Sequence, residues 1–119
     1  MARRVNSVVV VLVTCANEEQ GVSIARSLVG ERLAACVNLL RGVRSIYRWR
    51  DRIEDDRETL LLIKTRTRLL ARVERRVREL HSYEVPEVVA LPVAAGSKPY
   101  LDWVLESTTA RPRSKVRKP

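Results

Sequence analysis

The chain contains 119 residues, of which 45% are hydrophobic and 31% are charged. A chain of this length provides one domain, and its composition is typical of a folded protein rather than a disordered one. Lysine and arginine exceed aspartate and glutamate by 23 to 14, so the formal net charge is +9. Five of the basic residues stand in the last nine positions, which leaves +4 for the rest of the chain.

The cysteines and the apolar segments indicate where the protein resides. Cys15 and Cys36 both lie in apolar stretches, and two cysteines are too few for the disulfide framework of a small secreted domain. The apolar run at 8–13 has six residues, fewer than the roughly 7–15 of a secretory signal. No segment approaches the roughly 18 apolar residues that a membrane-spanning helix requires. We therefore expect reduced thiols, a cytoplasmic location and no membrane partner.

The first two predicted elements are a strand and a helix. Residues 8–14 form a continuous run rich in valine, which is typical of a central strand covered on both faces. Asn17 is a suitable N-cap, and Gln20 stands three residues later, where a capping box has its second member. Apolar residues then recur at helical spacing, so the helix is predicted to continue to about Arg32.

A long β-hairpin is predicted next. Strand character extends over 33–40, is interrupted at 41–42 as by a β-bulge, and resumes over 43–53. The polar residues 54–57 are predicted to form the turn, and 58–65 the returning strand.

The remaining elements complete the order of a known fold. A helix is predicted over 67–80, with an apolar stripe of Leu69, Val73, Val77 and Leu80. A strand follows over 88–93, where Pro92 indicates a sheet edge, and Ser97 can cap a last short helix. The order strand-helix-strand-strand-helix-strand predicts a ferredoxin-like α+β fold, with both helices on one face of a four-stranded antiparallel sheet.

This organisation divides the chain into three parts. We expect one domain over 8–107, an N-terminal arm at 1–7, and a basic, disordered tail at 108–119. No aromatic residue interrupts the basic run of the tail, which favours a solubilising terminus over a segment that stacks on nucleic-acid bases.

The predicted hairpin is too long for the rest of the domain to cover. The segment 43–53 alone would extend about 36 Å, at ~3.3 Å per residue, which is about twice the usual strand length. Tyr47, Trp49 and Ile53 alternate along it and are predicted to share one apolar side. Because an apolar two-stranded ribbon is marginal in water, the sequence predicts that these residues form an interface with other copies. The alternative is a shorter hairpin folded back on its own sheet.

Six segments together are similar to one known family. They are LAACVN (33–38), SIYRW (45–49), IKT (63–65), HSYEVPEV (81–88), LPV (91–93) and YLDW (100–103). In this order and spacing they resemble the signature of the CutA family, which is associated with tolerance of divalent cations such as copper. The resemblance implies a homotrimer built by hairpins that pair between subunits. It also implies an architecture similar to the PII signalling proteins, which bind small effectors between subunits.

Cys36 and His81 are the candidate metal ligands, because thiolates suit Cu(I) and imidazole suits Cu(II) or zinc. No segment has the ligand spacing of a structural zinc site. The resemblance implies that copper-linked relatives carry a cysteine late in the first strand and a histidine pair after the second helix. The matching positions here are Val13, and Leu80 with His81, so only one histidine of that set is retained. The alternative is that Cys36 packs in the core and His81 ends a helix.

A small-molecule cleft is the second candidate site. Glu58 and Lys64 share one strand face, where a charged side chain among leucines needs a polar partner. The resemblance places Trp49, Lys64 and the segment with Tyr83 and Glu84 near a groove between subunits. These five residues are therefore predicted to line a binding cleft. The alternative is a structural salt bridge between subunits, such as Lys64 with Glu84.

Other functional classes are disfavoured. The chain has one histidine, no GxSxG motif and no glycine-rich phosphate loop, so we expect no enzymatic activity. RNA-recognition domains share this element order but stack bases on aromatic residues of the inner strands, which this chain lacks. We therefore expect a non-enzymatic, cytoplasmic homotrimer associated with divalent-cation (copper) tolerance or response, without a specific nucleic-acid partner. A PII-like sensor or scaffold is the alternative.

Overall fold

The structure, a computed structural model, describes residues 7–110. The predictions made for residues 1–6 and for the basic segment 111–119 lie outside that range. The elements in chain order are β1 (Val8–Cys15), α1 (Glu18–Gly30), β2 (Cys36–Trp49), β3 (Arg52–Arg66), the 3-10 helix η1 (Thr67–Leu69), α2 (Leu70–Leu80), β4 (Val89–Pro92) and α3 (Lys98–Ser107). Within the described residues, no helix is long and apolar enough to cross a membrane.

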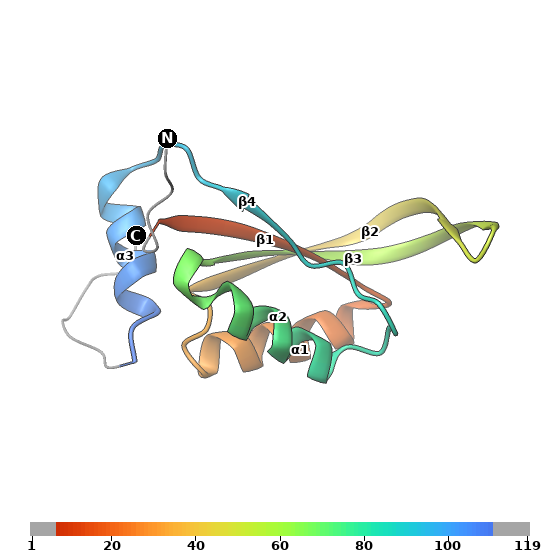
Figure 1. The fold of residues 1–119 in the computed structure, drawn as a ribbon, viewed down its shortest axis with the longest axis horizontal. Coiled ribbons are helices and arrows are strands. Elements are labelled where there is room, and N and C mark those ends of the chain that lie inside the picture. The colour runs from red at the N-terminus through yellow and green to blue at the C-terminus, as the bar shows by residue number, and fades with distance from the viewer. Residues whose placement is uncertain (1–6, 111–119) are drawn as a thin grey trace.

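The four strands form one antiparallel sheet in the order β2-β3-β1-β4, and α1 and α2 cover one of its faces (Figure 1). The predicted ferredoxin-like α+β fold is therefore confirmed. β1 lies inside the sheet, with β3 along its whole length on one side and β4 on the other. β4 forms an edge of the sheet, as Pro92 predicted, because a proline cannot donate a hydrogen bond to a further strand.

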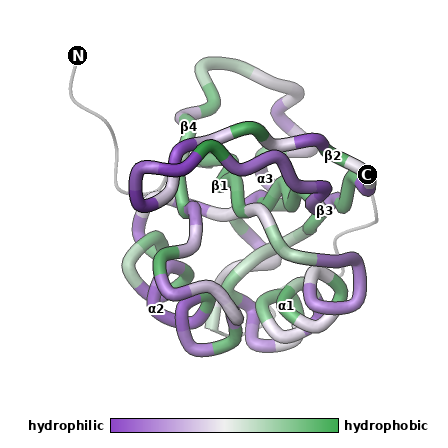
Figure 2. Tube along the Cα trace, turned by 90° about the vertical axis from the view of Figure 1, so that its right-hand side faces the viewer, coloured by the Kyte–Doolittle hydropathy of each residue, from purple (hydrophilic) through white to green (hydrophobic). Residues whose placement is uncertain are grey.

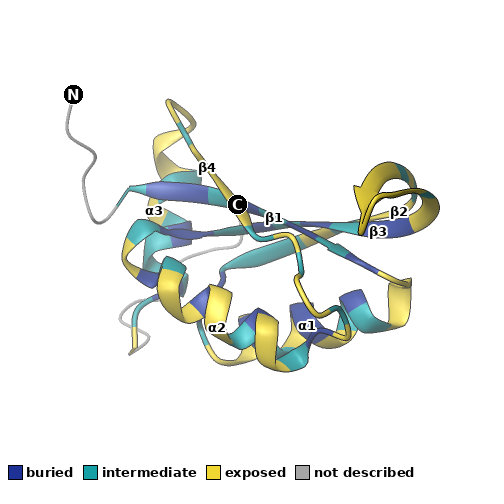
Figure 3. Ribbon diagram, turned by 45° about the vertical axis from the view of Figure 1, so that its right-hand side comes forward, coloured by how far each residue is buried: buried dark blue, intermediate teal, exposed yellow. Residues whose placement is uncertain are grey.

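The hydrophobic core lies between the sheet and the two covering helices (Figure 3). Side chains alternate along β3, so Leu61 and Ile63 face the helices and are fully buried. The predicted stripe of α2 is confirmed, with Leu69, Val73 and Val77 buried. Fully buried partners from the other elements are Val11, Val13, Cys15, Ile24 and Leu28. Removal of these apolar side chains from water is the main source of stability for a sheet with one covered face.

Helix α1 begins as the sequence predicted. The Asn17 side-chain oxygen accepts a hydrogen bond of 2.8 Å from the backbone N–H of Gln20, and Glu18 and Glu19 place negative charge in the first turn. The reciprocal bond of a capping box is not formed, because the Gln20 side-chain oxygen is buried without a partner among the described residues. The helix ends at Gly30, slightly earlier than predicted.

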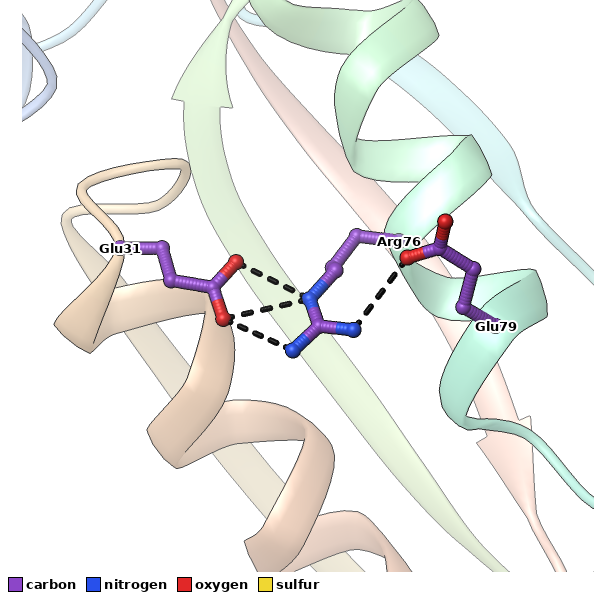
Figure 4. Close-up of polar contacts among 3 residues, drawn as sticks. All are labelled: Glu31, Arg76 and Glu79. Atoms are coloured by element: carbon purple, nitrogen blue, oxygen red, sulfur yellow. Dashed lines mark hydrogen bonds and ion pairs between the residues drawn. The ribbon is translucent and has the colours of Figure 1, made fainter.

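Ion pairs of one arginine, Arg76, join the end of α1 to α2 (Figure 4). The Arg76 guanidinium donates three hydrogen bonds of 2.9–3.2 Å to the two carboxylate oxygens of Glu31, and a fourth of 3.2 Å to Glu79. The hydrogen bonds from Arg76 lower the pKa of Glu31. Such a surface pair contributes little stability by itself, but its bidentate geometry favours one relative orientation of the two helices.

The turn of the β-hairpin differs from the prediction. It lies at Arg50 and Asp51, which have φ of 51° and 65°, and not at residues 54–57. Two consecutive residues with positive φ are typical of a type I′ hairpin turn, which usually contains asparagine or glycine. The polar segment 54–57 belongs to β3 because cross-strand partners stabilise it there: Asp55 accepts from Arg44 at 2.7 Å, and Asp56 from Tyr47.

The register of β2 with β3 changes which apolar residues share a side of the hairpin. Tyr47 and Trp49 pair with Glu54 and Arg52, whereas Ile53 pairs with Arg48. Paired residues in an antiparallel ladder share a face, so Ile53 lies opposite Tyr47 and Trp49, and the predicted single apolar side is wrong. Instead each face carries an apolar pair.

The hairpin extends well beyond the helices (Figure 1), as its length predicted. In the view from its tip, hydrophobic and hydrophilic residues mix along both of its strands (Figure 2). Ile46 and Ile53 occupy one face and are 65% and 70% exposed; Tyr47 and Trp49 occupy the other and are about 40% exposed. These four side chains are therefore left unpacked by the chain's own helices.

Helix α3 closes the end of the sheet far from the hairpin. Val104 on this helix is fully buried, and the Arg66 side chain at the end of β3 donates to the Leu105 carbonyl and, at 3.0 Å, to the Thr108 hydroxyl. Thr108 is itself buried. The packed structure therefore continues through Thr108, one residue beyond the predicted end of the domain.

Candidate functional site

A groove lies where the hairpin leaves the body of the protein. It contains two adjoining pockets, of about 320 and 450 Å3, which share Tyr47, Trp49, Tyr83 and Val85. The hairpin provides the first two of these residues, and the connector between α2 and β4 provides the other two. Pockets of this volume with aromatic walls are typical of small-molecule sites.

A buried carboxylate forms one end of the groove. Glu58 is only 7% exposed, and its Oε2 atom accepts a hydrogen bond of 2.5 Å from the Tyr83 hydroxyl. Burial and the bond to Glu58 raise the pKa of Tyr83 above its ordinary value, so the phenol stays protonated and donates across the neutral range. The pair fixes the connector against β3.

An arginine that the sequence did not indicate contacts two residues of the groove, Trp49 and Glu84. The Arg50 guanidinium lies 5.2 Å from the centre of the Trp49 ring, and it donates a hydrogen bond of 3.0 Å to Glu84. This stacked contact and the ion pair join the hairpin turn to the connector. Arg50 could have been placed here only if the turn had been located correctly. Neither residue of the turn is the glycine or asparagine that usually indicates a turn of this type.

His81 holds the connector rather than offering a ligand. Its Nε2–H donates to the Thr14 carbonyl at 2.7 Å, and its Nδ1 accepts the backbone N–H of Tyr83 at 3.0 Å. This arrangement fits the neutral Nε2–H tautomer. Because both ring nitrogens are engaged, His81 has no free lone pair for a metal ion in this chain.

The second predicted metal ligand lies elsewhere. Cys36 begins β2 and is half-buried; it pairs with Lys64, which pairs in turn with Val10 of β1. The carbonyl that holds His81 belongs to Thr14, four residues further along β1, or about 13 Å at ~3.3 Å per residue. The structure therefore does not bring the two ligands together within one chain. Across residues 7–110, no three His, Cys, Asp or Glu side chains group closely enough to hold a metal ion.

The remaining cysteine is part of the core. Cys15 is fully buried, and burial, together with the negative charge of Glu58, raises the pKa of its thiol to about 11. A thiol of this kind is uncharged and unreactive at neutral pH. It is not a candidate for nucleophilic chemistry.

Four of the five predicted cleft residues meet at the groove. Trp49, Glu58, Tyr83 and Glu84 line its two pockets, whereas Lys64 lies six residues from Glu58 along β3. The predicted shared face of Glu58 and Lys64 is confirmed by the register, but that face extends beyond the groove. In this chain Glu84 pairs with Arg50 and not with Lys64.

Comparisons with known proteins agree on one relationship. A family model described as CutA1 divalent ion tolerance protein matches residues 9–107. The divalent-cation tolerance protein CutA of Thermus thermophilus is 52% identical over 99 residues, which are 83% of this chain and 96% of that protein. Protein CutA of Homo sapiens is 50% identical over 102 residues, which are 86% of this chain but 57% of that protein. The chain thus spans little more than half the length of several curated relatives.

Solved structures show the same likeness. The divalent cation tolerance protein from Thermus thermophilus has a TM-score of 0.84 at 51% identity, covering 86% of this chain and 99% of that one. CutA1 from Oryza sativa has a TM-score of 0.85 at 43% identity, covering 90% and 98%. The fold and the groove thus define a small ferredoxin-like α+β protein with an extended hairpin. The chain belongs to the CutA1 divalent ion tolerance protein family.

Proposed function

We propose that this protein works as a homotrimer in the tolerance of divalent cations, copper among them, without catalysing a reaction. The observation that carries the oligomer is the exposed hairpin, where Ile46 and Ile53 are left largely in water. Apolar side chains exposed to this extent favour burial against further copies in a closed ring. The family supports the link with divalent cations. The two free cysteines support the reducing cytoplasm as its location.

Copper binding is proposed to depend on Cys36 and not on His81. The Cys36 thiol is free and half-buried, and thiolate is a preferred ligand of Cu(I). Both ring nitrogens of His81 are already hydrogen-bonded. A single thiol does not complete a site, so further ligands are proposed to come from sister chains.

This assignment can be tested by titrating the purified protein with Cu(I) against a competing chelator. Cys36→Ser is expected to weaken binding by about tenfold or more, which corresponds to about 1.4 kcal/mol. His81→Gln is expected to leave binding unchanged, because glutamine can still donate to the Thr14 carbonyl. Cys15→Ser is the matched control for loss of a thiol in the core.

Loss of binding in His81→Gln with retention in Cys36→Ser would reverse the assignment, and a wild-type protein that binds no copper would remove the copper role. Cation tolerance itself can be measured separately, as growth at raised copper of a bacterial strain that lacks its own CutA and expresses this chain. Failure to restore growth would contradict the proposed function even if copper binds in the test tube.

The groove favours a second candidate, which is PII-like binding of a small ligand. Its walls are aromatic, its acids are Glu58, Glu84 and Glu87, and it lies at the base of the hairpin that is proposed to contact other subunits. A thermal-shift screen of nucleotides and metabolites tests for such a ligand. With a true ligand, Trp49→Phe is expected to abolish the change in tryptophan fluorescence, whereas Trp103→Phe, far from the groove, retains it. If no compound shifts Tm, the groove serves only as structure.

A further inference from the structure

A pocket lined by arginines lies at the end of the molecule far from the hairpin. Its volume is about 430 Å3, and it forms where the ends of α1, β3 and α3 meet the start of α2. Arg32, Arg66, Arg68 and Arg72 all line it. This concentration of positive charge belongs neither to the groove nor to the basic segment 111–119.

Two of the four arginines are fixed in the floor of the pocket. Arg66 is 9% exposed and is held by its hydrogen bonds to Thr108 and to the Leu105 carbonyl. Arg32 has a φ of 62° just after α1, and its Nε atom donates to the Thr109 carbonyl at 2.7 Å. Both side chains are therefore held in place before any ligand arrives, which lowers the entropic cost of binding.

The other two arginines stand exposed at the rim. Arg68 and Arg72 are four residues apart, so they lie on the same side of the helical segment, where like charges repel. Neither forms an ion pair with another residue between 7 and 110. Burial and the nearby charge of Arg68 lower the pKa of Arg66, and the negative charge of Glu106 only partly offsets them. Among the described residues, the positive charges of Arg68 and Arg72 at the rim are thus left without an ion-pair partner.

The start of α2 adds to this imbalance. Neither η1 nor α2 has a side chain that caps its first turn, and neither carries an acidic residue there. The N-terminal end of a helix is positive, so arginines at this position are unfavourable unless an anion is near. Sequence and local electrostatics conflict here, and such conflicts commonly mark a functional site.

The acidic residue that lines the pocket does not relieve the conflict. Glu31 already directs both carboxylate oxygens to Arg76 (Figure 4). The negative charge of Glu31 is therefore already paired with Arg76 of α2. The guanidinium groups of Arg68 and Arg72 remain available to a ligand in the pocket.

We propose that this pocket binds the phosphate groups of a small phosphorylated molecule that carries at least two negative charges. Guanidinium groups form paired, charge-assisted hydrogen bonds to phosphate oxygens, and four of them from three directions match a di- or triphosphate better than a single carboxylate. The volume accommodates more than one phosphate group. This binding is independent of metal binding, of the groove and of the hairpin.

Isothermal titration of the full chain with pyrophosphate at low salt tests the proposal. Saturable binding at one site per chain is expected, and Arg68→Gln/Arg72→Gln is expected to raise Kd by about tenfold or more. The charge-matched control is Arg26→Gln/Arg75→Gln, which removes two exposed arginines that do not line the pocket and is expected to leave Kd nearly unchanged. A second variant replaces the five lysines and arginines of 111–119 with glutamine and is also expected to bind.

Each other outcome is decisive. Equal weakening in both double variants would reduce the effect to net charge, and loss only in the 111–119 variant would assign the binding to that segment; either result overturns the proposal. No saturable binding of pyrophosphate overturns it as well. ATP and inorganic phosphate in parallel titrations distinguish the source: equal affinity for ATP and pyrophosphate indicates recognition of the phosphates alone, and tighter ATP binding indicates a nucleotide.

Discussion

Replacing Ile46 and Ile53 together with aspartate is expected to convert the proposed trimer into single chains while each chain stays folded. Both side chains lie on one face of the hairpin and are largely exposed in one chain, so a polar substitute costs the isolated fold little. The proposed trimer would bury the same positions, and a desolvated, unpaired carboxylate destabilises a buried contact by several kcal/mol. Light scattering coupled to size-exclusion chromatography measures the mass directly.

The control for this experiment is Val29→Asp. Val29 is also an exposed apolar residue, but it lies on the outer side of α1, away from the hairpin. It is expected to leave the mass unchanged. A wild-type protein that runs as a single chain at micromolar concentration would contradict the homotrimer. A trimer that survives both aspartates would contradict the burial of Ile46 and Ile53 between subunits.

Tyr83→Phe is expected to lower the free energy of unfolding by about 1–3 kcal/mol at neutral pH. The substitution leaves the packing of the ring but removes the donor to Glu58, a carboxylate that is 7% exposed and then lacks this hydrogen bond. Tyr47→Phe is the matched control, because it removes a similar bond to Asp56 on an exposed part of the hairpin, where water can replace it. Denaturant unfolding at a fixed protein concentration measures both variants.

The pH dependence gives this prediction a second readout. The pKa of Tyr83 in the folded chain is raised above its ordinary value of 10.0, so its contribution to stability is complete below about pH 10. Above that pH the unfolded chain loses the phenolic proton while the folded chain retains it, and stability falls. The advantage of wild type over Tyr83→Phe is therefore expected to shrink above pH 10. A difference that stays constant up to pH 11 would contradict the raised pKa.

The parts of the fold that the sequence predicted correctly depend on local patterns. The cap at Asn17, the stripe of Val73 and Val77 and the edge position of Pro92 each follow from chemistry within a few residues. The break near Gly42, whose φ is 70°, is likewise a local glycine signal. Together these patterns were sufficient to establish the element order and the fold.

The parts that the sequence did not predict depend on partners distant along the chain. The turn at Arg50 and Asp51 forms because the residues after it find cross-strand partners in β2, which outweigh the polar character of that segment. His81 is unavailable as a metal ligand partly because it bonds to the Thr14 carbonyl, 67 residues away along the chain. No local sequence pattern indicates that contact. The separation of Lys64 from the groove follows from strand direction and length.

The bulge in β2 has a consequence for the groove. Between Leu40 and Val43 the strand advances three residues while β3 advances two, from Leu60 to Glu58. Even-numbered side chains of β2 point to the helix-free side before this extra residue, and odd-numbered ones do so after it. If the alternation continued unbroken through residues 41 and 42, without a bulge, Tyr47 and Trp49 would point to the opposite side of the sheet, away from Tyr83. The bulge thus determines which face of the outer hairpin carries Tyr47 and Trp49, and therefore which side chains reach the connector.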